Sequence, residues 1–226
     1  MIDHLSASSI KTYQQCPRRW RYRYLDRLAE PTTGAMNLGT RIHRLIESWW
    51  RGEHQPPVAG TYRYLETYRR MKGAVHPSEV AAVELELRGE MPGIGLPLVG
   101  YLDCLTKDGR IIDIKTSGRH WVLERALSEL QPAMYWFLCQ VNGIEPTGAE
   151  FHLLVGGNNG PIQGRVMPIA VEEEYLERHW RSMKLAWLGI QAGEFPAHRT
   201  ILCDYCPHQQ ICASEDRIGP DHSGAR

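Results

Sequence analysis

The sequence predicts an α/β fold in which a mixed central sheet is flanked by helices. Its 226 residues, of which 42% are hydrophobic and 23% charged, suffice for one large globular domain with a full core. Apolar residues recur at helical spacing from Leu38 to Trp49, and apolar and charged residues then alternate from Val83 to Arg88. This change of period predicts that helices and half-buried strands share a single domain over residues 1–226.

The first third of the chain is predicted to be mostly helical. Ser6 is a suitable N-cap for a first helix that ends near Cys16. An arginine-rich aromatic segment continues as a helix until the turn residues at 31–34. Two further helices are expected over residues 38–50 and 61–72.

Strands and helices mix in the rest of the chain. Pro132 belongs in a first helical turn, so a helix should begin near Ser128, with Ser128 and Gln131 at capping-box spacing. The polar end, residues 217–226, should be a frayed tail. Strands are expected over 83–87, 98–106, 110–115, 150–155 and 165–171, and helices over 121–141 and 172–191.

Charge and segment patterns limit the class of protein. The 26 basic and 26 acidic residues balance, so any nucleic-acid contact must rest on a local basic patch. No segment resembles a signal peptide or reaches the length of a membrane span, which predicts a cytoplasmic protein without a membrane partner. One basic patch is evident, and it consists of Arg18, Arg19, Arg21, Arg23 and Arg27, interleaved with Trp20, Tyr22 and Tyr24.

Four cysteines at the two ends of the chain predict one shared metal site. Cys16 is near the start, and Cys203, Cys206 and Cys212 follow a C-x2-C-x5-C spacing near the end. In a reducing compartment such a cluster favours metal binding over disulfides. The C-x2-C spacing by itself favours zinc, and His208 is a lesser alternative ligand. Cys104 and Cys139 lie in apolar patterns and are expected to be buried thiols.

A predicted hairpin carries two acids on one face. A two-residue turn at Asp108-Gly109 would put Asp103 and Asp113 on opposite faces, whereas a three-residue loop from Lys107 to Gly109 pairs them. Gly109 supplies the left-handed residue that the longer loop needs. In this register Tyr101 and Lys115 join the acids, and the apolar residues Leu102, Cys104, Ile112 and Ile114 share the other face.

The paired acids suggest a site for a hard divalent cation. Two carboxylates on adjacent strands suit Mg²⁺ or Mn²⁺, and Lys115 on the same face can stabilise charge developing on a phosphate. An ordinary solvent-facing hairpin is the alternative. Glu84 and Glu86 also alternate with apolar residues, which a solvated strand face explains, and Glu86 is kept as a secondary acid.

At these residues the chain resembles the PD-(D/E)XK nuclease superfamily. It looks most like the RecB-like branch, which includes CRISPR-associated RecB-like exonucleases and AddB-type nuclease domains with an iron–sulfur cluster. The matching motifs are Leu5 to Ser9 with Tyr13, Cys16-Pro17 and Trp20; Gly39-Thr40 with His43; Gly100 with Asp103; Asp113 to Thr116; Gln131 with Tyr135; and the terminal cysteines.

The resemblance implies a restriction-endonuclease-like fold and a set of roles. His43, Asp103, Asp113 and the Ile114 carbonyl would bind Mg²⁺ or Mn²⁺, and Lys115 would assist catalysis. Gln131 and Tyr135 would touch DNA or orient Lys115. Cys16, Cys203, Cys206 and Cys212 would hold a [4Fe–4S] cluster, with Zn²⁺ as the alternative. Residues 1–30 and 196–215 would form an iron–sulfur module at the DNA entry.

The implied activity is metal-dependent hydrolysis of DNA from single-stranded ends, in recombination, repair or CRISPR adaptation. Arg18, Arg19 and Arg21 are expected to contact phosphates, with Trp20 and Tyr22 available to stack on bases. No nucleotide-binding motif of a helicase is present, so the protein either works alone on ends or is recruited by a partner, for which a helicase and a CRISPR integrase are candidates. A non-catalytic DNA-binding adaptor and a zinc-stabilised nuclease are the alternatives.

Overall fold

The computed structural model describes residues 2–31, 33–53, 56, 60–156 and 160–217. The chain divides into a terminal unit, residues 1–31 with 183–226, and a central unit, residues 32–182. In the described part of the chain, no helix is long and apolar enough to span a bilayer.

A five-stranded sheet with the order β1-β2-β3-β4-β5 is the framework of the central unit. β3 and β4 run parallel, and the other neighbouring strands run antiparallel, so the predicted mixed sheet is confirmed. The parallel pair is possible because two helices cross over between β3 and β4. The strands are β1 (Val80–Met91), β2 (Leu96–Thr106), β3 (Arg110–Ser117), β4 (Gly148–Val155) and β5 (Gln163–Ile169).

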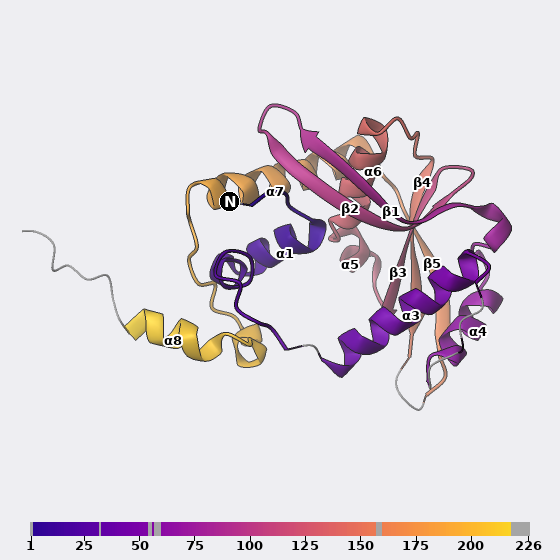
Figure 1. Ribbon diagram of the computed structural model, residues 1–226, viewed down its shortest axis with the longest axis horizontal. Coiled ribbons are helices and arrows are strands. Elements are labelled where there is room, and N and C mark those ends of the chain that lie inside the picture. Colours follow the sequence, from indigo (N-terminus) through magenta and orange to yellow (C-terminus); the bar gives the residue numbers. More distant parts are fainter. Residues whose placement is uncertain (1, 32, 54–55, 57–59, 157–159, 218–226) are drawn as a thin grey trace, which may run out of the picture. The chain divides into compact units, whose positions relative to one another are not determined.

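Helices cover both faces of this sheet (Figure 1). α3 (Gly34–Trp50) and α4 (Tyr62–Arg70) lie on one face, and α5 (Leu123–Leu127) and α6 (Gln131–Val141) lie on the other. A short 3-10 turn, η2 (Pro77–Glu79), leads into β1.

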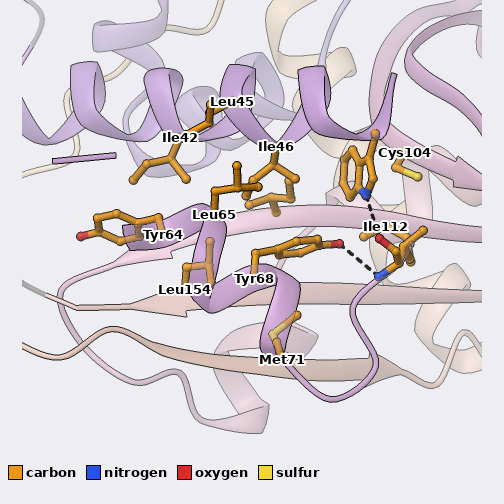
Figure 2. Packing of buried hydrophobic residues seen from close by; sticks show 13 residues of the cluster. Ile42, Leu45, Ile46, Tyr64, Leu65, Tyr68, Met71, Cys104, Ile112 and Leu154 are labelled. Atoms are coloured by element: carbon orange, nitrogen blue, oxygen red, sulfur yellow. Dashed lines mark hydrogen bonds between the residues drawn. The ribbon is translucent and has the colours of Figure 1, made fainter. Parts of the chain in front are cut away.

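The core between α3, α4 and the sheet holds α3 above the hairpin strands. Ile42 and Ile46 of α3 are fully buried together with Cys104 and Ile112 of the hairpin (Figure 2). Tyr68 of α4 anchors this core, and its hydroxyl lies 2.9 Å from Nδ1 of His152 on β4 and 3.4 Å from the Val75 amide. The Trp50 indole N–H donates to the Val75 carbonyl at 3.0 Å, which closes the end of α3 over the same core.

On the opposite face, glycines let α6 approach the strands closely. A Cβ at Gly100 of β2 would lie 2.8 Å from Leu138 Cδ1 and 2.9 Å from the Tyr135 ring, and a Cβ at Gly89 of β1 would meet Val141 at 2.8 Å. α6 therefore lies directly on the strands that lead to the hairpin, and its first turn is fixed beside β3.

The two ends of the chain form the terminal unit together. The Tyr13 hydroxyl donates to the Glu194 carbonyl at 2.7 Å, and the Trp20 ring stacks on Phe195 with centroids 5.6 Å apart. Cys16 stands at the junction of the first two helices. The helical elements are α1 (Ala7–Gln15), α2 (Pro17–Trp20), the π-helix η1 (Arg21–Leu25), the end of α7 (Glu173–Gln191), η3 (Ile201–Tyr205) and α8 (Gln209–Arg217).

Local hydrogen bonds explain where element boundaries differ from the predictions. α3 begins at Gly34 and not at Leu38, because the Thr33 side chain accepts from the Met36 amide and caps the helix earlier. The predicted capping box at Ser128 is wrong, because that hydroxyl donates to the Arg125 carbonyl and α6 begins at Gln131. α8 was not predicted, and the expected tail falls almost wholly on residues 218–226, which lie outside the described residues.

Gly100→Ala should destabilise the fold, because the added methyl group would push Leu138 and Tyr135 away from β2. The expected loss is about 1–3 kcal/mol in the free energy of unfolding, measured by urea denaturation. Gly118→Ala is the matched control, because a Cβ at that exposed position meets nothing within 4 Å. Equal stability of the two variants would contradict the proposed close packing of α6.

Candidate active site

The hairpin between β2 and β3 has the register that the sequence predicts. Cys104 pairs with Ile112 and Leu105 with Ile111, so the same register sets Asp103 opposite Asp113. Gly109 takes a φ of +88° at the end of the three-residue loop, as expected. The predicted apolar face is confirmed, because Leu102, Cys104, Ile112 and Ile114 are all fully buried.

The strands of the hairpin part at Asp103. Asp103 Oδ2 accepts the Ile114 amide N–H at 2.7 Å, so a side-chain carboxylate takes the place that a strand carbonyl would otherwise hold. Beyond the two pairs nearest the turn, no further pair joins β2 and β3, both of which are described in full. The acid is therefore fixed at the fork between two strands.

Lys115 connects the acid of β3 to α6. Its ammonium lies 2.6 Å from Asp113 Oδ2 and donates to Gln131 Oε1 at 2.6 Å. The Gln131 amide donates in turn to the Tyr135 hydroxyl at 3.1 Å, one helical turn further along α6. These contacts join Asp113, Lys115, Gln131 and Tyr135 into one chain of polar groups.

His43 reaches the same place from α3. Its Nδ1 lies 3.5 Å from Asp103 Oδ2. The helix can approach β3 because Gly39 has no side chain, and a Cβ there would lie 3.1 Å from the Thr116 hydroxyl oxygen. The structure thus brings together the six side chains that the sequence predicts for the site, which are His43, Asp103, Asp113, Lys115, Gln131 and Tyr135.

The two aspartates have opposite pKa shifts. Burial raises the pKa of Asp113 to about 6, with a further contribution from the Asp103 charge, although Lys115 acts in the opposite direction. Burial also acts to raise the pKa of Asp103, but the hydrogen bond and charge of His43, the charge of Lys115 and the Ile114 amide together lower it. Asp103 is therefore the member of the pair that stays ionised to lower pH, and Asp113 is the member whose pKa is raised, to about 6.

Lys115 stays protonated in this environment. Burial acts to lower its pKa, but the nearby charges of Asp113 and Asp103 raise it above the ordinary value. Lys115 is therefore a fixed positive charge and hydrogen-bond donor, and it is poorly suited to act as a base in this state.

Two further acids, neither of them predicted as a site residue, border the site. Glu47 lies one helical turn beyond His43 and is 8% exposed, and burial, Glu84 and Asp103 raise its pKa to about 7. Glu84 takes a left-handed φ of +52°, which is uncommon for a residue other than glycine. The i, i+4 spacing from His43 was the available signal for Glu47. Glu86, the acid kept as a candidate, instead pairs with Arg88 at 2.6 Å on an exposed part of β1.

The donor set at the hairpin suits a hard divalent cation. Two carboxylates and an imidazole converge, and Asp113 Oδ2 is buried without a well-aligned hydrogen bond despite its short contact with Lys115. Within the described residues, no three or more histidine, cysteine, aspartate or glutamate side chains are already arranged to hold a metal ion. Oxygen ligands of this kind are those that Mg²⁺ and Mn²⁺ prefer.

In the terminal unit, Cys16, Cys203, Cys206 and Cys212 line one cavity together with Arg19 and Tyr22. Cys16 comes from the start of the chain, whereas Cys203 lies in η3, Cys206 directly follows η3, and Cys212 lies in α8. Folding therefore brings these distant positions together. Arg18 Nη1 donates to Cys212 Sγ at 3.8 Å. Cys104 and Cys139 are fully buried elsewhere, as predicted.

The basic patch is paired with carboxylates. Arg19 binds Glu30 at 3.0 Å, Arg18 pairs with Asp216, and Arg21 pairs with Glu215. Contact of these arginines with phosphate stays a prediction, and it would require exchange of these partners. The base-stacking role given to Trp20 and Tyr22 is wrong for this conformation, because they are 0% and 1% exposed. The Trp20 indole N–H donates to the Ser9 hydroxyl, so this aromatic residue is part of the core.

The comparisons with known proteins agree with this geometry. The model of a family described as the PD-(D/E)XK nuclease superfamily matches residues 4–71 and 58–213. A provisionally assigned exonuclease from Eubacterium rectale has a similar structure, with 15% identity over 91% of this chain and 88% of that chain and a TM-score of 0.65. The structure of the protein SSO0001 is similar at 16% identity over 94% and 87%, with a TM-score of 0.58. At such identities these likenesses show the fold alone. No curated protein matches the chain.

Glu47→Gln should stabilise the protein above pH 7 and have little effect below pH 4.5. The pKa of Glu47 rises from 4.5 to about 7 on folding, so the wild type loses stability as pH rises through this window, and the uncharged amide avoids that loss. We expect a gain of about 1–3 kcal/mol at pH 8, measured by urea denaturation at both pH values. Glu177→Gln, at an exposed position of α7, is the control. If the difference in unfolding free energy between Glu47→Gln and wild type did not change with pH, destabilisation by the ionised Glu47 carboxylate would be refuted.

Proposed function

Because the chain belongs to the PD-(D/E)XK nuclease superfamily, we propose that it is a divalent-metal-dependent deoxyribonuclease that degrades single-stranded DNA from its ends. The observation that carries this proposal is the pair of buried acids at the parted hairpin, with protonated Lys115 between Asp113 and Gln131. In a hairpin with only a structural role, two carboxylates and an ammonium buried together would destabilise the fold, because removing charged groups from water is costly.

The metal would be held by His43, Asp103, Asp113 and the carbonyl of Ile114. Their donor set is mostly oxygen, which suits Mg²⁺ or Mn²⁺. When bound, the cation would polarise the scissile phosphate and lower the pKa of the attacking water. Asp103 is suited to this role because its pKa lies below the ordinary value, and Asp113 becomes a full ligand once it has lost its proton near pH 6.

Lys115 would stabilise the negative charge that develops on the phosphate. Its raised pKa keeps the ammonium charged at neutral pH, and Gln131 fixes the direction of one of its N–H bonds. Tyr135 orients Gln131 from the next turn of α6. Together these side chains hold the donor in place before the substrate arrives, which lowers the reorganisation needed in the transition state.

The preference for ends and the biological setting belong to the same proposal. The exonuclease assignment of the Eubacterium rectale neighbour is consistent with action at ends. Recombination, repair and CRISPR adaptation each produce such DNA, and a helicase or integrase partner would supply it, since the chain has no phosphate-binding loop of its own.

We further propose that Cys16, Cys203, Cys206 and Cys212 hold a [4Fe–4S] cluster. In support, all four line one cavity, and the Arg18 hydrogen bond to Cys212 Sγ is of the kind that stabilises a ligating thiolate. Structural Zn²⁺ is the alternative for four thiolates. In either case the centre would join the two ends of the chain and would take no part in the chemistry at Lys115.

Asp113→Ala should lower kcat for cleavage of end-labelled single-stranded DNA with Mn²⁺ at least about a thousandfold. Lys115→Ala should cost about a hundredfold or more, because a fixed donor to the developing charge is lost. Asp108→Asn, an exposed acid in the same hairpin, is the matched control and should keep wild-type activity. Undiminished cleavage by Asp113→Ala would instead support a non-catalytic DNA-binding role.

Cys203→Ala should destabilise the terminal unit more than it alters the chemistry at the hairpin. The expected loss is about 4 kcal/mol or more of unfolding free energy, together with loss of bound iron and acid-labile sulfide. Ser214→Ala, on exposed α8, should change neither quantity. Anaerobic iron, sulfide and zinc analysis identifies the metal. A fully stable Cys203→Ala protein without a metal would contradict the proposal that the centre holds the two ends of the chain together.

A further inference from the structure

A second binding region adjoins the candidate active site on the sheet. A cavity of about 370 Å³, within the size range of small-molecule sites, lies over β4 and β5. Its apolar lining comes from Trp121, Leu153 and Val155, and its polar lining includes His120, Gln163 and Arg165. None of these residues has a role in the proposed catalytic machinery.

The strand register connects this cavity to Lys115. Lys115 pairs with Leu153, and Leu153 pairs with Arg165, so the three residues form one row across β3, β4 and β5. Residues paired across neighbouring strands share a face, and strands lie about 4.8 Å apart, which sets the Arg165 backbone about 10 Å from that of Lys115. The cavity therefore begins one strand away from the proposed catalytic lysine.

Aromatic side chains make the same connection. The Lys115 ammonium lies 5.7 Å from the centroid of the Phe151 ring, and Phe151 contacts Trp121 edge-on with centroids 5.4 Å apart. The Arg125 guanidinium covers the Trp121 ring at 4.2 Å. The Trp121 indole N–H is buried and has no hydrogen-bond partner among the described residues, which is rare for such a donor.

This combination of surfaces suits one nucleotide. The apolar side chains Leu153 and Val155 offer a floor for a base, and an acceptor on the base edge would satisfy the unpaired Trp121 donor. Arg165 is exposed on β5, on the side of the cavity away from Lys115, where it can bind a phosphate. A purely apolar ligand would leave the Arg165 and His120 groups without a function in binding.

We propose that this cavity binds the nucleotide next to the scissile phosphate, with its base against Leu153, Val155 and Trp121 and its phosphate against Arg165. The proposal rests on the nuclease function above and adds a substrate subsite to it. Lys115 and Arg165 would then contact two phosphates of the same strand, and the row that they share would set the path of that strand across the sheet.

The test uses single-stranded oligonucleotides in which one phosphate at a time is a neutral methylphosphonate, with kcat/KM measured in Mn²⁺. For wild type, kcat/KM should fall about tenfold when the methylphosphonate replaces one particular phosphate beside the scissile one. Arg165→Ala should lower kcat/KM about tenfold on unmodified DNA. A methylphosphonate at that phosphate should lower kcat/KM of this variant no further, because the two changes remove the same contact. Arg119→Ala removes an exposed arginine outside the cavity lining and should follow the wild-type profile.

An abasic residue at the same nucleotide should also cost wild type about tenfold. The proposal is overturned if Arg165→Ala keeps the wild-type methylphosphonate profile, or if the abasic penalty falls on a different nucleotide. Arg165→Gln serves as the second variant if thermal unfolding shows that the alanine protein is not folded. If cleavage depends on Asp113 but not on Arg165, only the subsite proposal is refuted. If cleavage is independent of Asp113, the proposed nuclease function itself is refuted.

Discussion

The hydrogen bond from the Ile114 amide to the Asp103 carboxylate is the interaction on which the site depends. It ends the pairing of β2 with β3 and opens a fork, while β3 remains fixed by its full parallel ladder with β4. Lys115 and Asp113 can then turn toward α6, and His43 can approach from α3. The glycines at 39 and 100 permit both helices to come this close to the sheet.

The site concentrates negative charge that the fold alone does not neutralise. Asp113 and Glu47 both have raised pKa values because burial and neighbouring acids oppose their ionisation. Lys115 acts against this shift at Asp113, and His43 acts against it at Glu47. Such an arrangement costs stability in the absence of a ligand, and a divalent cation would relieve it. The strained backbone at Glu84 lies in the same region and adds to that cost.

Structural features that follow from local sequence patterns could be predicted well. Contacts between residues far apart in the sequence could not. The hairpin register followed from Gly109 and the alternation around Asp103, because turn geometry and burial both demand one solution. The pairing of Arg18 with Asp216 joins positions 198 residues apart, and no periodicity reveals it. The burial of Trp20 likewise depends on Phe195 from the other end of the chain. Glu47 was missed because its neighbour Glu84 becomes close only in the folded sheet.

Calorimetric titration of Mn²⁺ measures directly whether the parted hairpin is a divalent-cation site. Asp103→Asn is the most informative variant, because its amide oxygen can still accept the Ile114 N–H while the charge is lost. Wild type is expected to bind Mn²⁺ at pH 7.5, and Asp103→Asn should weaken this binding at least about tenfold. The affinity of wild type for Mn²⁺ should also fall as the pH drops below about 6, where Asp113 takes up a proton. Equal Mn²⁺ affinity for wild type and Asp103→Asn would contradict the proposed cation site.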